Sequence, residues 1–208
     1  MRALLRALAA EIVPGGAPRA RPPDAATSKA LRTFLEAADA PARWPGTTGA
    51  LDRAAGGLLV HVRDVLRAHD GTAPVATEYG VTLRTALLLR ADYCAATPAG
   101  AFQDLIEWAA RGLTGADADP ATAATTLALL LRAAPADVGP RPRPVVAGGL
   151  KRALRAATGY AADARTVAPL LAAAAAFLER EGPDLDAGAI SSLHGAAAPA
   201  LGAALSAA

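Results

Sequence analysis

Apolar residues recur along most of this chain at the three- and four-residue intervals that place side chains on one face of an α-helix. The same spacing appears in three separate stretches of the sequence. The apolar positions of these stretches are Leu58, Leu59, Val62, Val65 and Leu66; Phe102, Leu105, Ile106, Ala109 and Leu113; and Val167, Leu170, Leu171, Ala174, Phe177 and Leu178. Since no convincing stretch alternates apolar and polar residues, the pattern predicts helices and no strands.

Proline and glycine divide the helical pattern at fairly even intervals. Thr97-Pro98 and Asp119-Pro120 each place a capping oxygen before a proline at the first helical position, where the missing N–H group costs nothing. Together these signals predict helices near residues 2–13, 28–40, 49–69, 78–96, 98–113, 120–134, 144–158, 164–181 and 187–206.

Helices of this length, joined by short connections, are expected to pack as antiparallel neighbours. Alternate predicted helices begin near residues 49, 98, 144 and 187, a spacing of roughly 43 to 49 residues that is close to the period of HEAT and armadillo repeats. The expected fold class is therefore all-α, with stacked antiparallel helix pairs forming a HEAT/armadillo-like α-solenoid. A closed helical bundle is the alternative, because no sequence motif recurs from one unit to the next.

Two stretches rich in proline suggest how the chain is organised. Residues 1–27 are expected to form an N-terminal helix followed by a flexible linker of proline, glycine and arginine. Residues 28–134 are expected to form helical repeats, residues 135–144 a proline-rich linker, and residues 145–208 further helical repeats.

Composition agrees with the helical prediction and narrows the functional classes. Hydrophobic residues make up 53% of the 208 residues, and alanine and leucine, the strongest helix formers, dominate that share. The net charge of +2 gives no global reason to expect nucleic acid or an anionic membrane as partner. With one cysteine, no intrachain disulfide can form. No apolar run approaches the ~20 residues that span a bilayer, so we expect a soluble, intracellular protein, with an organelle transit peptide in the basic first residues as an alternative.

Signals of catalysis are almost absent from the sequence. Cys94 has no nearby histidine that could activate a thiolate, so we expect a small buried side chain. His61 and His69 share one predicted helix and His194 stands alone, without the carboxylates or cysteines of a metal site. We therefore expect no enzyme activity in this chain and no catalytic, cofactor-binding or metal-binding residues. A small helical enzyme is the least favoured alternative.

Basic residues gather between residues 132 and 165, which contain seven positively charged residues and only two acidic ones, Asp137 and Asp163. The seven are Arg132, Arg141, Arg143, Lys151, Arg152, Arg155 and Arg165. Such a concentration is the strongest charge pattern in the chain, and it is the best candidate for a functional surface.

Within that stretch, Lys151, Arg152 and Arg155 share one flank of a predicted helix. The other side of the helix holds Val146, Leu150 and Leu154. We take these three basic residues as the candidate partner-binding patch, suited to an acidic peptide or, more weakly, to a nucleic acid backbone. A solvated helix face is the commoner meaning of such a stripe and is the alternative.

Large side chains crowd into residues 78–108. This segment holds two of the three tyrosines, the only cysteine, one of the two tryptophans and one of the three phenylalanines, although aromatic residues are only 4% of the chain. Packing explains such crowding without any catalytic role, so we expect Tyr79, Leu83, Leu87 and Leu88 to lie mostly in the core.

The order of motifs through this segment resembles a known family. The motif residues are Leu58, Leu59, Val62 and Leu66 on a first helix, then Tyr79-Gly80, then Leu87 to Arg90, then Tyr93-Cys94, then Phe102, Leu105 and Ile106. In this order they resemble the N-terminal region for telomere-length maintenance and DNA damage repair (TAN) of ATM-type phosphatidylinositol-3-kinase-related Ser/Thr protein kinases, of plant and green-algal type. Residues 130–140 and 177–194 resemble later pieces of the same region.

The resemblance implies a non-catalytic helical-repeat region that acts by partner recruitment in the nucleus, in the DNA double-strand-break response and in telomere maintenance. The implied partner is the break-sensor complex MRN. Full-length relatives are ATP-dependent Ser/Thr kinases, so the resemblance implies that this chain is a detached or fragmentary N-terminal region, or the product of a gene model that was cut short. The family's short basic N-terminal signature matches only at Ser28, Lys29, Arg32 and Leu35. An unrelated intracellular all-α protein-binding scaffold is the alternative.

Overall fold

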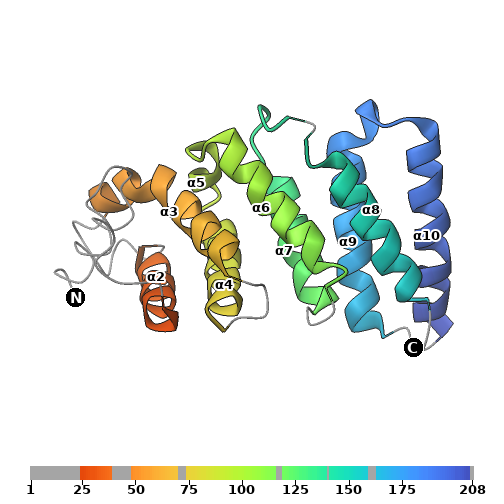
Figure 1. Ribbon diagram of the computed structural model, residues 1–208, viewed down its shortest axis with the longest axis horizontal. Coiled ribbons are helices and arrows are strands. Elements are labelled where there is room, and N and C mark those ends of the chain that lie inside the picture. The colour runs from red at the N-terminus through yellow and green to blue at the C-terminus, as the bar shows by residue number, and fades with distance from the viewer. Residues whose placement is uncertain are drawn as a thin grey trace. The chain divides into compact units, whose positions relative to one another are not determined.

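The computed structural model describes residues 24–38, 48–69, 74–115, 119–139, 141–158 and 163–206. Regular secondary structure in these residues is entirely helical, so the all-α prediction is confirmed (Figure 1). The elements are α2 (Ala25–Ala38), α3 (Thr48–Ala68), α4 (Pro74–Leu89), α5 (Asp92–Ala95), α6 (Ala99–Gly112), α7 (Pro120–Ala133), α8 (Arg143–Ala156), α9 (Ala164–Glu181), the 3₁₀ turn η1 (Gly182–Asp184) and α10 (Ala187–Ser206).

Most predicted helices agree with these bounds to within a few residues, and the last two agree at both ends. The helix predicted near residues 2–13 lies outside the described residues. The single helix predicted over residues 78–96 is wrong. The chain instead forms α4, which begins earlier at Pro74 and ends at Leu89, and then the short helix α5.

Side-chain contacts of Arg90 explain why α4 does not continue. The Arg90 guanidinium donates two hydrogen bonds to Asp92, from Nε to Oδ1 at 2.9 Å and from Nη2 to Oδ2 at 2.6 Å. It also lies 4.3 Å from the centroid of the Tyr93 ring. Residues two positions apart do not face each other on a regular α-helix, so these contacts favour a corner.

The two predicted N-caps differ in outcome. Asp119 caps α7 as expected, because its carboxylate accepts from the backbone N–H groups of Ala121 at 3.1 Å and Thr122 at 3.3 Å. The predicted cap at Thr97 is wrong. The Thr97 hydroxyl donates backwards to the carbonyl of Tyr93 at 2.7 Å and so closes the turn after α5.

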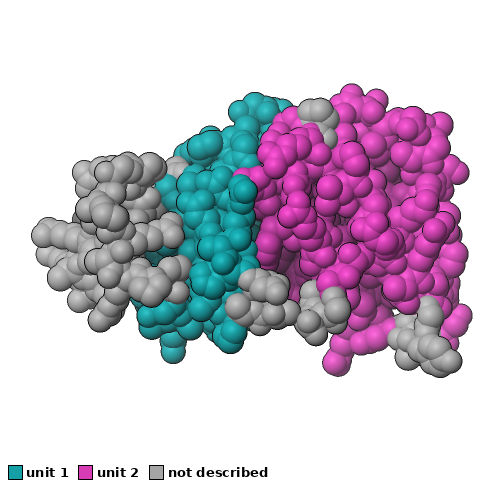
Figure 2. Space-filling view, viewed as in Figure 1, with its two compact units in different colours: residues 1–102, 133–138 teal, residues 103–132, 139–208 magenta. Residues whose placement is uncertain are grey.

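The chain divides into two compact units (Figure 2). Unit 1 comprises Met1–Phe102 and Ala133–Val138, and unit 2 comprises Gln103–Arg132 and Gly139–Ala208. One boundary therefore falls inside α6. The proline-rich stretch at residues 135–144 contributes residues to both units, and its role as a linker stays a prediction.

In unit 1, α4 packs against α2 and α3, and α5 packs against α3 and α4. The largest buried side chains come from every one of these helices, because each turns its apolar stripe inwards. They include Leu31, Leu35, Leu58, Leu59, Val62, Tyr79, Leu83 and Tyr93. The residues that carry the family resemblance in this unit are thus mainly packing residues.

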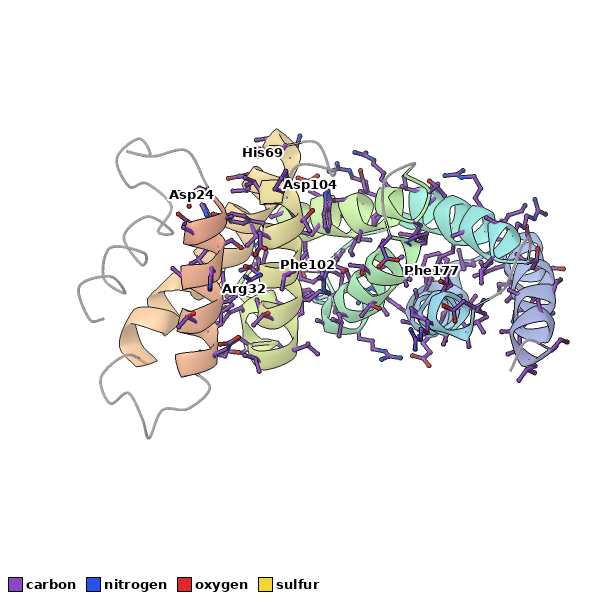
Figure 3. All side chains as sticks on the ribbon, turned by 90° about the horizontal axis from the view of Figure 1, so that it is seen from below. Asp24, Arg32, His69, Phe102, Asp104 and Phe177 are labelled. Carbon is purple, nitrogen blue, oxygen red and sulfur yellow. The ribbon has the colours of Figure 1, made fainter. Side chains whose placement is uncertain are left out.

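Polar side chains also fix α2 on α4. The hydroxyls of Ser28 and Thr82 are both buried and lie 2.7 Å apart, within hydrogen-bond distance. Arg32, labelled on α2 in Figure 3, forms an ion pair with Glu78, with Nη2 and Oε2 2.7 Å apart. Ser28 and Arg32 are two of the matches to the family's basic signature, and within this structure they hold two helices together.

The core prediction for α4 is correct at three of its four positions. Tyr79, Leu83 and Leu87 are buried, as expected for residues four apart on one face. Leu88 is 67% exposed, so the prediction is wrong there. Each residue turns the helix by about 100°, which places Leu88 on the side of Thr77, away from α2 and α3.

In unit 2, α8 packs against α9, and α10 packs against both. Phe177, labelled in Figure 3, is fully buried together with Leu150, Leu154 and Leu170. The α8 helix also comes very close to α6. A Cβ atom at Gly149 would lie 2.9 Å from the carbonyl oxygen of Ala110, so only glycine fits at this crossing.

The apolar positions predicted from spacing are buried, apart from Leu171 and Leu178, which are half-buried. None of the helices in the part of the chain that the structure describes is long and apolar enough to cross a membrane.

Candidate partner-binding surface on α8

The sequence places the three candidate residues on the outward side of α8. The inward side is formed by Val146, Gly149, Leu150, Ala153 and Leu154, all of which are buried. Lys151, Arg152 and Arg155 point away from these residues, because they lie half a turn or so from the buried stripe. The structure therefore brings all three predicted residues together on one helix face.

These three side chains reach the surface, and the described residues supply no carboxylate to them. Arg152 and Arg155 are exposed and Lys151 is half-buried. Among the described residues, no acidic side chain forms an ion pair with any of them. The Arg152 guanidinium lies along the helix beside Gly148, where a Cβ atom would be 3.5 Å from Nη1.

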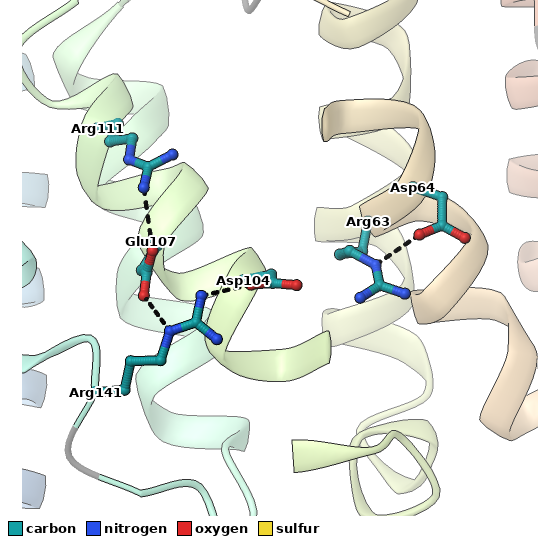
Figure 4. Close-up of polar contacts among 6 residues, drawn as sticks. All are labelled: Arg63, Asp64, Asp104, Glu107, Arg111 and Arg141. Carbon is teal, nitrogen blue, oxygen red and sulfur yellow. Dashed lines mark hydrogen bonds and ion pairs between the residues drawn. The ribbon is translucent and has the colours of Figure 1, made fainter. Parts of the chain in front are cut away.

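Arg141 belongs to the same basic stretch but has a different role. Its Nη2 lies 3.0 Å from Oδ1 of Asp104, and its Nε lies 3.1 Å from Oε1 of Glu107 (Figure 4). Glu107 also accepts from Arg111, at 3.1 Å. Arg141 thus ties the segment before α8 to α6, and its charge is neutralised by two carboxylates.

Arg143 is held even more firmly, at the first residue of α8. Its guanidinium contacts Glu181 at the end of α9 and lies 2.5 Å from Oδ2 of Asp184 in η1. The hydrogen bond to Glu181, with support from Asp184, raises the pKa of Arg143. Glu181 is buried and also pairs with Arg180 at 3.1 Å. These contacts hold the first residue of α8 against the end of α9 and the turn η1.

The structure therefore separates the seven basic residues into two kinds. Arg141 and Arg143 form ion pairs with carboxylates within unit 2. The remaining cations are Arg132 on α7 and Arg165 on α9, each exposed, together with the three residues of α8. We call Lys151, Arg152 and Arg155 the α8 patch. One ammonium and two guanidinium groups on adjacent helical turns can bind carboxylates or phosphates, the guanidinium groups in bidentate fashion.

Chemistry elsewhere in the described residues is sparse. Cys94 is buried, and desolvation, followed by the negative charge of Asp92, raises the pKa of its thiol to about 11. His61 Nε2 lies 3.3 Å from the hydroxyl of Tyr79, and His69 Nδ1 lies 2.9 Å from the carbonyl of Val65. No cluster of three or more histidine, cysteine or acidic side chains suited to a metal ion occurs within the described ranges.

No protein-family model, curated protein or solved structure matches this chain. The case for the α8 patch consequently stands on the geometry of its own residues.

The sequence identified the α8 patch, but it did not reveal the ion pairs that Arg141 and Arg143 form. Their acidic partners lie 34 to 41 residues away along the chain. A weak signal exists, since Glu181 ends a predicted helix, where a carboxylate is unfavourable without a cation nearby. That signal does not say which arginine supplies the cation.

Proposed function

We propose that this chain is a non-catalytic helical scaffold that binds acidic segments of partner proteins through the α8 patch. The observation that carries the proposal is the contrast within one basic stretch. Arg141 and Arg143 have carboxylate partners, whereas the three cations of the α8 patch have none among the described residues. Uncompensated cations on one rigid helix face favour a partner with carboxylates or phosphates.

The proposal includes a HEAT/armadillo-like arrangement of the helices. Support comes from the packing inside each unit, where helices that are neighbours in sequence pack as pairs, α3 with α4 and α8 with α9. A compact domain of this length has a radius of gyration of about 17 Å. Small-angle X-ray scattering of the chain should give a clearly larger value, and a value at or below that figure would contradict a solenoid.

For the biological role, we propose an ATM-like function by resemblance: recruitment to DNA double-strand breaks in the nucleus, with telomere maintenance as a second task and the MRN complex as partner. The support is the order of motifs from Leu58 to Ile106. An unrelated all-α binding scaffold is the alternative. A downstream reading frame that ends in a kinase domain would favour the ATM-like role, and its absence from mapped transcripts would favour the alternative.

The α8 patch is tested by charge reversal. The variant Lys151→Glu/Arg152→Glu/Arg155→Glu should bind a glutamate-rich peptide at least ~10-fold more weakly than the parent chain, as measured by fluorescence anisotropy. The matched control, Lys29→Glu/Arg132→Glu/Arg165→Glu, reverses three exposed cations elsewhere and has the same net charge. It should keep most of the affinity.

Equal losses in the two variants would mean that overall charge, and no particular surface, attracts the peptide. Unchanged binding by the α8 variant would reject the patch outright. A duplex DNA fragment measured in parallel distinguishes the partner classes, because tighter binding of the duplex than of the peptide at the same salt concentration would favour a nucleic acid backbone. Pull-down of the MRN complex with the same two variants tests the specific partner. Clear ATP turnover by the purified chain would contradict the non-catalytic assignment.

A further inference from the structure

Two helices, α6 and α8, end in the same short pattern, an arginine in the last turn with a threonine three residues after it. Arg111 precedes Thr114 at the end of α6, and Arg155 precedes Thr158 at the end of α8. No other serine or threonine of the sequence follows an arginine at this distance. Both threonines are exposed. Because kinases select substrates by the charges near the target hydroxyl, the pattern indicates two candidate phosphorylation sites.

The structure gives the two sites different charges. Arg111 donates to the carboxylate of Glu107 at 3.1 Å. Arg155 has no carboxylate partner among the described residues, and neither have Lys151 and Arg152, which precede it on the same helix. A kinase that recognises arginine through its own acidic side chains can therefore bind Arg155 without displacing an ion pair. At Arg111 it must first displace Glu107, so the structure favours the site on α8.

Thr158 extends the α8 patch by one turn. Ala157 keeps a helical backbone, with φ of −71° and ψ of −10°. The backbone N–H of Thr158 donates to the carbonyl of Arg155 at 3.3 Å, and its hydroxyl donates to the same oxygen at 2.6 Å. Seven residues make almost two helical turns, so Lys151 lies on the same side of the helix, about 10 Å away along the axis. The last turn of a helix opens at little cost in free energy, which lets a kinase reach the hydroxyl.

We propose that Thr158 is a phosphorylation site that switches off the α8 patch. A Ser/Thr kinase transfers the γ-phosphoryl group of ATP to Oγ1 of Thr158. The bond from Oγ1 to phosphorus forms, the bond from that phosphorus to the β,γ-bridging oxygen breaks, ADP leaves, and the hydroxyl proton passes to the catalytic base of the kinase. The regulation rests on the partner-binding role proposed above for the α8 patch, whereas the modification itself depends only on the kinase.

A phosphate at this position opposes partner binding in two ways. It carries about −1.5 to −2 charges at neutral pH, so the charge of the α8 patch falls from +3 to about +1 to +1.5. Its oxygens also accept from Arg155 and Lys151 and so occupy the donors that a partner carboxylate needs, at the high effective concentration of an intramolecular group. The C-terminal end of the helix disfavours a negative charge, but at an exposed position this effect is small beside the adjacent cations.

The modification is tested on the purified full chain with ATP and a Ser/Thr kinase that selects arginine three residues before its target. Mass spectrometry counts the phosphates and locates them, and we expect one phosphate, on Thr158. Thr158→Val should abolish it, and Arg155→Gln should slow it at least ~10-fold. The matched control, Thr114→Val, should be phosphorylated like the parent chain, because its threonine has the same spacing but a paired arginine. Equal rates at the two threonines, or no phosphate on Thr158, would overturn the proposal.

The regulatory effect is tested by the affinity for a glutamate-rich peptide, measured by fluorescence anisotropy. The chain phosphorylated at Thr158 should bind the peptide at least ~5-fold more weakly than the unmodified chain, and treatment with a phosphatase should restore the affinity. Thr158→Glu should reproduce part of the loss. Thr114→Glu adds the same charge at an exposed position away from the α8 patch, so it should bind like the parent chain.

The switch and the α8 patch fail in different ways in this experiment. If the unmodified chain binds no peptide, the α8 patch is not a partner site and the switch fails with it, even where mass spectrometry finds phosphate on Thr158. If the unmodified chain binds the peptide and the phosphorylated chain binds it equally well, the α8 patch stands and the switch alone is refuted. Equal losses for Thr158→Glu and Thr114→Glu would also refute the switch, since overall charge would then explain both.

Discussion

Two adjacent glycines on α8 offer a direct test of how closely α8 packs against α6. Gly148 and Gly149 have the same local sequence and the same helical backbone, but their surroundings differ. A Cβ atom at Gly148 would lie 3.5 Å from the end of the flexible Arg152 side chain. At Gly149 it would lie 2.9 Å from the backbone carbonyl oxygen of Ala110 and 3.3 Å from Leu113 Cδ1.

The two substitutions should therefore change stability in opposite directions. Alanine in place of glycine inside a helix contributes about 0.5–1 kcal/mol at either position, through lower backbone entropy in the unfolded chain. At Gly148 nothing opposes this gain, so Gly148→Ala should be stabilised by that amount. At Gly149 a rigid backbone atom must move, and overpacking of this kind costs about 1–3 kcal/mol. The net result for Gly149→Ala is a loss of up to about 2 kcal/mol.

Thermal and urea unfolding, followed by circular dichroism at 222 nm, would measure both effects on one scale. For a chain of this length, each kcal/mol corresponds to a shift in Tm of about 2–4 °C. Gly149→Ala should melt below the parent chain and Gly148→Ala above it. If Gly149→Ala were as stable as Gly148→Ala, the close approach of α8 to Ala110 would be wrong, and with it the reason for glycine at that position.

Two further predictions concern unit 1. Leu87→Ala should lower the free energy of unfolding by about 2–5 kcal/mol, because it leaves a cavity at a buried site. Leu88→Ala should change it by no more than about 0.5 kcal/mol, because Leu88 is exposed. Equal losses for the two variants in urea unfolding would contradict the burial of one face of α4. Burial raises the pKa of the Cys94 thiol to about 11, so the unfolded chain loses this proton at a lower pH than the folded chain does. The free energy of unfolding should therefore fall as the pH rises from about 9 to about 11. Cys94→Ala should show a smaller alkaline loss, and in the native chain a thiol reagent should react only slowly at neutral pH; rapid labelling there would show that the thiol is not buried.

The positions of most helices could be read from the sequence because their signals are local. Asp119 beside Pro120 marks the start of α7, and the spacing of Val167, Leu170 and Phe177 marks the inner face of α9. Such signals depend on residues within a turn or two of each other. The break after Leu89 was not predicted, since it depends on how Arg90 divides its contacts between Asp92 and Tyr93, for which no simple sequence rule exists.

What the sequence by itself determined is that the chain is helical, where most helices begin and end, and that Lys151, Arg152 and Arg155 lie on one outward face of α8. Only the tertiary structure decided which charges remain available. Arg141, Arg143 and Arg152 look alike in the sequence, but the first two meet carboxylates 34 to 41 residues away, whereas Arg152 meets none among the described residues. Tertiary packing likewise buried Leu87 and exposed Leu88. The physical reason is that helix formation depends on neighbours along the chain, whereas charge compensation and burial depend on neighbours in space.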